Sequence, residues 1–468
     1  MKIIEFLLLA FFCFCIYSQT NFSNDKKIAE ILSRLPEKNN RAILIFDPET
    51  KDTIYKENIF KQLIPASNTK IFTTAAVYHY FGKNYSINTQ IRGNEINKGD
   101  SVLKGNLYFK GYGNGIFTTE KLDALINDFF KTGIKIIEGN IIGDDTFFDS
   151  LYSRKDWIEE ERSMLSLPPV SALNLNRNEV IITLEPDRYT GKVKISAKPE
   201  GNFIRIINKL KLSGAKSKPK ITAVFKDGVL EISVAGSYRK QSRSRSYSIY
   251  VSSPPLFASA YLYHKLIKLG IKIYGIPAIG ETPQNTVVYA EDKLPVKEML
   301  SIINKRSNNF LAECLFKIIG AEFVGGKGNS FYSAQAINSM IEDLDLSGGT
   351  SLVDGSGISR GNLTTAASIG GILENIYFND SIYKDFYSTL SVAGNDGTLA
   401  DRKNNRKYNY KFHGKTGTLR GVSSLSGYLS TEKGNELIIS IIFNFTKGSS
   451  ELYKSTEDQI IEYLAESK

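Results

Sequence analysis

The spacing of apolar and polar residues changes several times along the chain, and each spacing predicts a different element. Two apolar runs, 42–46 and 53–55, flank a turn that contains Pro48, which predicts a β-hairpin. Over 67–81 the apolar positions recur at helical intervals, so we expect a helix that begins at a serine. A second helix is expected over 119–130. Short β segments are predicted around it at 107–109, 136–137 and 141–142.

The pattern becomes alternating between about residues 180 and 251, where one short strand follows another. This change predicts a small all-β insertion. The elements expected beyond it are helices over 256–269 and 296–319, strands over 424–429 and 436–443, and a C-terminal helix that ends near residue 465. A break is expected within the second of these helices, because Ser307, Asn308 and Asn309 compete with the backbone for its hydrogen bonds.

The first eighteen residues differ from the rest of the chain. Lys2 precedes an apolar run over 6–17, which is shorter than the ~20 residues of a membrane-spanning helix, and polar residues follow it. These features predict a secretory signal peptide over residues 1–18 that is cleaved near Ser18, with a retained anchor as the alternative. We therefore expect an exported protein that acts in the periplasm or the cell envelope.

The composition is that of a folded protein with an ordinary core. Of the 468 residues 42% are hydrophobic and 23% are charged, which excludes disordered, collagen-like and disulfide-scaffold proteins. Without the signal peptide Cys314 is the only thiol, so no disulfide is expected. One Cys and three scattered His do not form a metal cluster, and we expect neither a metal nor another cofactor. The scarcity of His also argues against a Ser-His-Asp enzyme.

The net charge of +10 is concentrated in one segment. Residues 201–245 contain eleven Lys or Arg and two acids, and eleven minus two gives +9 of that total. The segment lacks the interleaved aromatic residues of a single-strand binder and the motifs of a groove reader, so no nucleic-acid partner is expected. Two interpretations stay open, an anionic envelope polymer as partner and a solvated face, and the solvated face is favoured.

A candidate nucleophile stands at Ser67. In Ser67-Asn68-Thr69-Lys70 the S-x-x-K spacing places a hydroxyl and an amine on one face of a helix, where the amine can take the proton of the hydroxyl. The pattern occurs eight times in the chain, so by itself it is mostly chance. Only this copy opens a long apolar helix, where backbone N–H groups and the helix dipole can stabilise an oxyanion.

Two further patterns carry candidate chemistry. K-T-G occurs at 131–133, where it ends a helix, and at Lys415-Thr416-Gly417-Thr418, where it is expected to precede a strand. In the second copy Gly417 would leave the strand surface open to a substrate backbone, and Lys415 would offer a positive charge to a carboxylate. A plain turn is the alternative. Ser307-Asn308-Asn309 would project polar side chains from the helix break, with an interhelical loop as the alternative.

The order S-x-x-K, S-x-N, K-T-G resembles that of the penicillin-binding, active-site-serine D-alanyl-D-alanine peptidases, specifically the class C low-molecular-mass (DacB-type) carboxypeptidases and endopeptidases. The 240 positions between Ser67 and Ser307 suit the inserted domains of that class and are too many for a simple β-lactamase. The resemblance covers residues 28–461. Family-like stretches occur at 105–107, 143–148, 171–176, 354–360 and 393–399.

The resemblance implies an α/β (α+β) fold. An antiparallel sheet flanked by helices would form a penicillin-binding-protein or β-lactamase-like transpeptidase domain with two nested insertions. The implied domains are a serine peptidase domain at 24–84 and 285–468, an inserted α/β domain at 85–178 and 252–284, and an inner, mostly β, basic domain at 179–251.

The resemblance also implies a mechanism. Ser67 would attack the carbonyl of a D-Ala-D-Xaa bond with Lys70 as its base, and the N–H groups of Ser67 and Thr418 would form the oxyanion hole. Ser307 would relay a proton to the leaving amine, and Asn309 would hold the acyl-side amide. Lys415 with Thr416 would bind the terminal carboxylate, and Gly417 would contact the substrate. Asp144 or Asp145 would contact a stem-peptide amine, although the favoured alternative is that both are plain turn acids.

The resemblance implies peptidoglycan stem peptides or cross-bridges as substrates and β-lactams as covalent inhibitors. A loose association with the envelope or membrane surface is compatible with the sequence. Two alternatives remain, a non-catalytic protein that binds peptidoglycan or an anionic polymer, and a β-lactamase or esterase of the same fold. The chain departs from the family pattern at Asn114, where an acid is expected, and after Trp157, where acids replace a second aromatic residue. Both departures concern the substrate rather than the chemistry.

Overall fold

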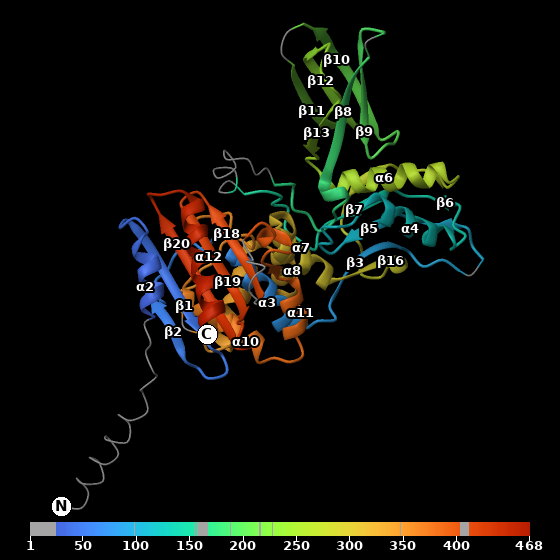
Figure 1. Cartoon of the computed structure of the whole chain (residues 1–468). Coiled ribbons are helices and arrows are strands. Elements are labelled where there is room, and N and C mark those ends of the chain that lie inside the picture. The colour runs from blue at the N-terminus through green and yellow to red at the C-terminus, as the bar shows by residue number, and fades with distance from the viewer. Residues whose placement is uncertain are drawn as a thin grey trace, which may run out of the picture. The chain divides into compact units, whose positions relative to one another are not determined.

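The computed structural model describes residues 25–468 except 98, 155–156, 158–166, 188, 215–216, 227, 347 and 403–410 (Figure 1). The predicted signal peptide, residues 1–18, lies outside the described residues. The chain forms two compact units. The first comprises the described residues up to Lys83 with Leu300–Asn308 and Ile337–Lys468, and the second comprises Asn84–Met299 and Asn309–Ala336. None of the helices in the described ranges has the length and apolar character that a membrane crossing requires.

The first unit is built on a six-stranded antiparallel sheet with the order β17-β18-β19-β20-β1-β2 (Figure 1). Its strands are β1 (Asn39–Phe46), β2 (Thr53–Glu57), β17 (Ser391–Val392), β18 (Lys411–Leu419), β19 (Val422–Ser430) and β20 (Glu436–Phe445). The predicted hairpin is confirmed, because β1 pairs with β2 around a turn closed by the backbone of Asp47. The pairing of β1 with β20 joins the two ends of the chain in one sheet.

Helices cover both faces of this sheet. On one face α2 (Lys26–Ser33) and α12 (Ser450–Ser467) bury apolar side chains such as Ile28 and Leu464 against the strands. On the other face α10 (Ala366–Tyr377) packs on Leu44 and on α3 (Thr69–Phe81). The remaining helical elements of this unit are η1 (Ala66–Asn68), the end of α7 (Val296–Arg306), the end of α9 (Ser330–Asp343), α11 (Tyr383–Thr389) and η3 (Gly397–Leu399).

The second unit contains a five-stranded sheet with the order β15-β7-β5-β3-β16 and a small sheet with the order β14-β6-β4. Their strands are β3 (Ser86–Gly93), β4 (Val102–Leu103), β5 (Leu107–Gly111), β6 (Ile136–Ile137), β7 (Ile141–Asp144), β14 (Lys272–Ile273), β15 (Pro277–Ile279) and β16 (Val287–Pro295). The accompanying helices are α4 (Thr119–Phe130), η2 (Asn176–Asn178), α6 (Pro254–Lys268) and α8 (Asn309–Val324). The short strands and the helix predicted between 107 and 142 are therefore confirmed.

The segment between 179 and 250 is composed of strands, as the alternating pattern predicts. They are β8 (Glu179–Asp187), β9 (Lys192–Lys198), β10 (Ile204–Ser213), β11 (Lys218–Lys226), β12 (Val229–Arg239) and β13 (Arg245–Tyr250). They form two three-stranded sheets, β13-β8-β9 and β10-β12-β11, whose inner faces meet in a core that includes Leu184, Ile232 and Tyr238. The division into two compact units is coarser than the three predicted domains, which stay a prediction.

Local expectations near the motifs need refinement, although the α/β fold class is confirmed. The helix expected over 67–81 is the turn η1 followed by α3. The break expected within the helix over 296–319 is confirmed, because α7 and α8 are separated at Ser307, which takes a left-handed φ of 52°. The K-T-G element was expected before a strand, but it lies within β18.

Candidate active site

The candidate nucleophile and the lysine that follows it lie at the start of α3. Ser67 is part of η1, and Lys70 lies in the first turn of α3. The Nζ of Lys70 donates a hydrogen bond of 3.0 Å to the Oγ of Ser67, which is the contact that the S-x-x-K spacing predicts. Lys70 is fully buried, whereas Ser67 is partly exposed. A substrate can therefore reach the hydroxyl, while the amine is shielded from water.

A loop from a distant part of the sequence holds this lysine. The Nζ of Lys70 also donates to the backbone carbonyl of Ser356. The carboxylate of Asp354 fixes the loop, because it accepts a hydrogen bond of 2.7 Å from the backbone N–H of Gly357. Gly357 has a φ of 81°, and a side chain there would collide with the carbonyl of Ala66, the residue before the nucleophile. The loop thus packs against both members of the Ser-Lys pair.

The S-x-N and K-T-G elements meet although 108 positions separate their residues. Lys415 on β18 donates hydrogen bonds to the Oγ of Ser307 at 2.9 Å and to the carbonyl of Thr416 at 2.7 Å. Ser307 lies at the break between α7 and α8, so its hydroxyl does not compete with the backbone hydrogen bonds of a helix. Two of the three motifs therefore share a direct side-chain contact.

Burial has an electrostatic consequence for Lys415, whose side chain is inaccessible to solvent. Removal from water penalises its charged form, and repulsion from Lys70 adds to this effect, so the pKa of Lys415 lies well below its usual value. Both lysines belong to the first unit. A carboxylate placed beside Lys415 would favour its charged form again.

The strand β18 lies against the turn that carries the nucleophile. A Cβ added at Gly417 would lie 2.7 Å from the carbonyl oxygen of Pro65 and 3.0 Å from the backbone nitrogen of Ser67. The Oγ of Ser424 donates a hydrogen bond of 2.7 Å to the same Pro65 carbonyl. A glycine is thus required at position 417, because any side chain there would prevent the close approach of the two backbones. The sequence predicts a different role for Gly417, which is to leave the strand surface open to a substrate. The close approach brings the backbone N–H groups of Ser67 and Thr418 to the same region.

Part of one edge of β18 has no strand partner among the described residues. β17 pairs with β18 only at His413 and Gly414, so in the described part of the chain no strand pairs with that edge over Lys415–Leu419. An extended peptide can add to such an edge through backbone hydrogen bonds. The site therefore offers a place for a peptide backbone next to the candidate nucleophile.

A set of supporting contacts that no motif predicts connects the S-x-N and K-T-G elements to residues 391–399. Lys305, two positions before Ser307, forms an ion pair of 2.5 Å with Asp396. The hydroxyl of Thr416 donates to the Oγ1 of Thr398 at 2.8 Å. Burial alone would raise the pKa of Asp396, but the hydrogen bond from Lys305 and one from a backbone N–H outweigh it and lower the pKa. The only signal in the sequence was a family-like stretch, which says nothing about these partners.

Three predicted site residues lie in the second unit. Asn309 is the first residue of α8. Asp144 is fully buried, and its carboxylate pairs with Lys110 at 3.1 Å and accepts a hydrogen bond of 2.8 Å from the backbone N–H of Thr282. Asp145 accepts hydrogen bonds from two hydroxyl groups at 2.8 and 2.9 Å. These contacts fit the interpretation of both acids as structural, and their contact with substrate stays a prediction.

The two departures from the family pattern also lie in the second unit. Asn114 is buried, and its side-chain amide donates to the carboxylate of Asp292 at 3.4 Å. An acid at position 114 would place two carboxylates side by side, so the amide suits this neighbour. Trp157 is buried, and the acids that follow it lie outside the described residues.

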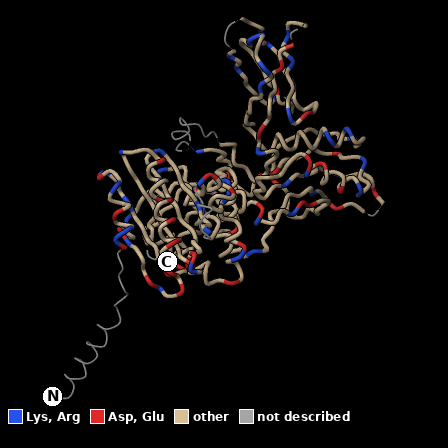
Figure 2. The backbone as a smooth tube through the Cα atoms, viewed as in Figure 1, with Lys and Arg blue, Asp and Glu red and all other residues tan. Residues whose placement is uncertain are grey.

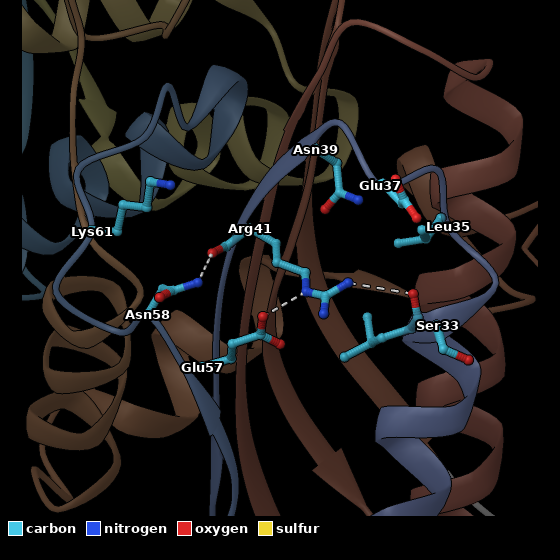
Figure 3. A pocket seen from close by; sticks show the side chains of 9 residues that line it. Ser33, Leu35, Glu37, Asn39, Arg41, Glu57, Asn58 and Lys61 are labelled. Carbon is cyan, nitrogen blue, oxygen red and sulfur yellow. Dashed lines mark hydrogen bonds and ion pairs between the residues drawn. The ribbon is translucent and has the colours of Figure 1, made fainter.

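A polar pocket of about 340 Å³ lies elsewhere in the first unit, beside α2, β1 and β2 (Figure 3). Its Arg41 binds the carboxylate of Glu57 at 2.8 Å and the carbonyl of Leu32 at 3.3 Å. None of its lining residues belongs to the three motifs. Because its arginine is engaged by the protein itself, we assign the chemistry to the motif residues instead.

Known proteins resemble this chain over almost its whole length. The model of the D-Ala-D-Ala carboxypeptidase 3 (S13) family matches residues 24–467. A D-alanyl-D-alanine carboxypeptidase of Actinomadura sp. (strain R39) is 30% identical over 443 residues, which cover 91% of this chain and 81% of that protein. The D-alanyl-D-alanine carboxypeptidase DacB of Haemophilus influenzae is 24% identical over 443 residues, with 93% and 91% covered.

Solved structures share the fold. The crystal structure of penicillin binding protein 4 (dacB) from Haemophilus influenzae has a TM-score of 0.77 at 24% identity, and the match covers 94% of this chain and 99% of that one. A structure of the same protein complexed with a β-lactam has a TM-score of 0.73 at 23% identity and the same coverage.

Proposed function

The chain belongs to the D-Ala-D-Ala carboxypeptidase 3 (S13) family, and we propose that it hydrolyses D-Ala-D-Xaa bonds in peptidoglycan stem peptides or cross-bridges through an acyl-enzyme on Ser67. The family predicted from the order of the motifs is thus confirmed. The observation that carries the proposed chemistry is the 3.0 Å hydrogen bond between Lys70 and Ser67, in which a buried amine faces an accessible hydroxyl.

Acylation begins when the Nζ of Lys70 takes the proton of the Ser67 hydroxyl. The Oγ then forms a bond to the carbonyl carbon of the D-Ala-D-Xaa link, and the carbonyl oxygen becomes an oxyanion. The backbone N–H groups of Ser67 and Thr418 stabilise that oxyanion, and the close approach of Gly417 to the Ser67 nitrogen supports this assignment. Lys70 keeps its orientation through the carbonyl of Ser356.

The leaving amine needs a proton when the C–N bond breaks. Ser307 donates it and is resupplied by Lys415, to which its Oγ is hydrogen bonded. Lys415 and Thr416 bind the terminal carboxylate of the leaving residue. Since a carboxylate favours the charged form of Lys415, substrate binding places a proton where the leaving amine requires one. Asn309 holds the amide on the acyl side.

After the amine has left, Lys70 gives the proton that it took from Ser67 to solvent, which balances the proton that Lys415 gained when the carboxylate bound. Neutral Lys70 then takes a proton from the water that attacks the ester and returns it to the Oγ of Ser67, so the shortened peptide and free Ser67 are released. A β-lactam is attacked in the same way at its strained amide, so we propose that β-lactams acylate Ser67 covalently. Slow hydrolysis of that ester distinguishes a penicillin-binding peptidase from a β-lactamase of the same fold.

We further propose that the protein is exported and acts in the envelope, on the evidence of the predicted signal peptide at 1–18. Amino-terminal sequencing of the mature protein is expected to begin after residue 18. A full-length chain confined to the cytosol would contradict export. We also retain the three-domain division as a proposal, supported by the separate sheets between 179 and 250.

Release of D-alanine from a pentapeptide stem tests the reaction. Wild type is expected to release it, and Ser67→Ala is expected to lose the activity. Ser381→Ala is the matched control, because Ser381 also begins an S-x-x-K pattern but is exposed and distant in sequence from the motifs. Activity on cross-linked dimers with none on the pentapeptide would identify an endopeptidase. No cleavage of either substrate would favour a non-catalytic binding protein.

A further inference from the structure

The outer face of the sheet β10-β12-β11 carries a regular arrangement of lysines. β12 is the central strand; it pairs in parallel with β10 and in antiparallel with β11. Residues that pair across neighbouring strands project from the same face. Two rows across this face have a lysine at each end and a small residue in the centre; they are Lys211-Ser237-Lys218 and Lys209-Ala235-Lys220.

The spacing of these lysines follows from strand geometry. The two rows are two residues apart along each strand, or about 6.7 Å, and the lysines of one row are two strand spacings apart, or about 9.6 Å. The four side chains therefore line the two sides of a shallow strip whose floor is β12. Ser233 continues the floor of small residues.

The four lysines point into solvent without neutralisation by the fold. Lys209, Lys211, Lys218 and Lys220 are exposed, and among the described residues none has an acidic partner. The acid on the outer face of β12 is Glu231, which is paired with Arg205 at 2.7 Å. Figure 2 shows how Lys and Arg outnumber Asp and Glu along these strands. The face is thus strongly positive, and its field is not cancelled locally.

The inner face of the same sheet explains why the arrangement is not required for folding. The alternate residues of β12, such as Leu230, Ile232 and Val234, are buried in the core that the two sheets share. The lysines contribute nothing to that core. Like charges that share one face of a sheet do not stabilise it, so the four lysines in two aligned rows call for another explanation.

We propose that this lysine strip binds a linear phosphodiester polymer that lies along β12 between the two lines of lysines. A fully extended polypeptide spans at most about 3.5 Å for each residue, that is, for three backbone bonds. By the same measure, a polymer with six backbone bonds between successive phosphates places them about 7 Å apart. This distance matches the ~6.7 Å between the two rows of lysines. The small residues of the floor allow the polymer backbone to approach. The binding holds the protein on an anionic matrix, and it goes beyond the peptidase function without depending on it.

A membrane surface fits the strip less well than a polymer. Peripheral membrane binding combines basic residues with aromatic or large apolar side chains that enter the lipid. The outer-face positions of β10, β11 and β12 contain no aromatic residue; their large apolar side chains are Val224, which is exposed, and Ile207 and Val229, which are partly exposed. The strip therefore offers positive charges and hydrogen-bond donors but few large apolar side chains that could enter a lipid layer.

The test compares two variants of the full-length mature protein with equal loss of charge. The strip variant carries Lys209→Gln, Lys211→Gln, Lys218→Gln and Lys220→Gln. The control variant changes four other exposed lysines of the same unit to Gln, namely Lys192, Lys194, Lys198 and Lys268. The probe is end-labelled, delipidated poly(glycerol phosphate), and its binding is followed by fluorescence anisotropy over a range of salt concentrations.

The strip variant is expected to bind the polymer at least about tenfold more weakly than wild type in physiological salt, while the control retains its affinity. The slope of log K against log salt is expected to become shallower by about 3 in the strip variant alone, since four contacts of ~0.7 each are lost. Unchanged circular dichroism and pentapeptide hydrolysis show that both variants are folded. Equal losses in the two variants, no binding by wild type, or binding to phosphatidylglycerol vesicles but not to the polymer would each overturn the proposal.

Discussion

Replacement of Gly357 by alanine tests whether the loop over 354–359 sets the position of the nucleophile. With a φ of 81°, an alanine at this position is strained by about 1–2 kcal/mol. Its methyl group would also collide with the carbonyl of Ala66 and lie 2.9 Å from the Oγ1 of Thr69. Relief of the collision moves the turn that carries Ser67 by about 1 Å, and a displacement of that size reduces kcat/KM by about 100-fold.

Gly434→Ala is the matched control. Gly434 lies in the same unit with a φ of 87°, and the space around its missing side chain is open. Alanine there is expected to lower the free energy of unfolding by the same ~1–2 kcal/mol without any change in activity. The rate of acylation by benzylpenicillin, followed by intact mass, is compared between the two variants after urea unfolding has shown both to be folded. Acylation of Gly357→Ala as fast as that of the control would refute the reasoning.

Three further outcomes follow from the described contacts. Asp396→Asn is expected to lower the free energy of unfolding by about 1 kcal/mol at neutral pH, because the ion pair with Lys305 is lost. The fold lowers the pKa of Asp396, so the difference between wild type and the variant is fully present above the unfolded pKa of ~3.9. Urea titrations are expected to show that this difference disappears as the pH falls through the folded-state pKa. The alkaline limb of kcat/KM is expected at lower pH than that of kcat, because free Lys415 loses its charge early as the pH rises and bound carboxylate restores it; coincident limbs in the two pH profiles would contradict this. Cys314 is buried with a raised pKa, so a thiol reagent is expected to modify it in denaturant but not in the native protein, as mass spectrometry will show.

The elements with a clear period could be predicted from the sequence. The helix predicted over 119–130 has the same bounds in the structure, where the side chain of Thr118 caps its first turn. The hairpin at the start of the first unit was equally clear from two apolar runs around a turn. The strand β18 was missed, since Gly414 and Gly417 interrupt its apolar pattern and resemble a turn.

The site itself could be predicted only as a set of motifs. The pairing of Ser67 with Lys70 follows from their helical spacing, and the structure has it. The contact between Ser307 and Lys415 joins residues from distant segments, so no local pattern contains it. The contact between Lys70 and the carbonyl of Ser356 could not be predicted either, because every residue has a backbone carbonyl and the residue type does not indicate which one is used. Long-range register in the sheet, rather than local propensity, creates these contacts.

The central claim is that Ser67 forms a covalent acyl-enzyme, and intact-mass spectrometry with benzylpenicillin tests it most directly. Wild type is expected to gain the mass of one penicilloyl group, and peptide mapping is expected to place that group on Ser67. Ser67→Ala is expected to remain unmodified, while Ser381→Ala behaves as wild type. A modification that persists in Ser67→Ala, or the absence of any adduct on wild type while the drug stays intact, would contradict the account.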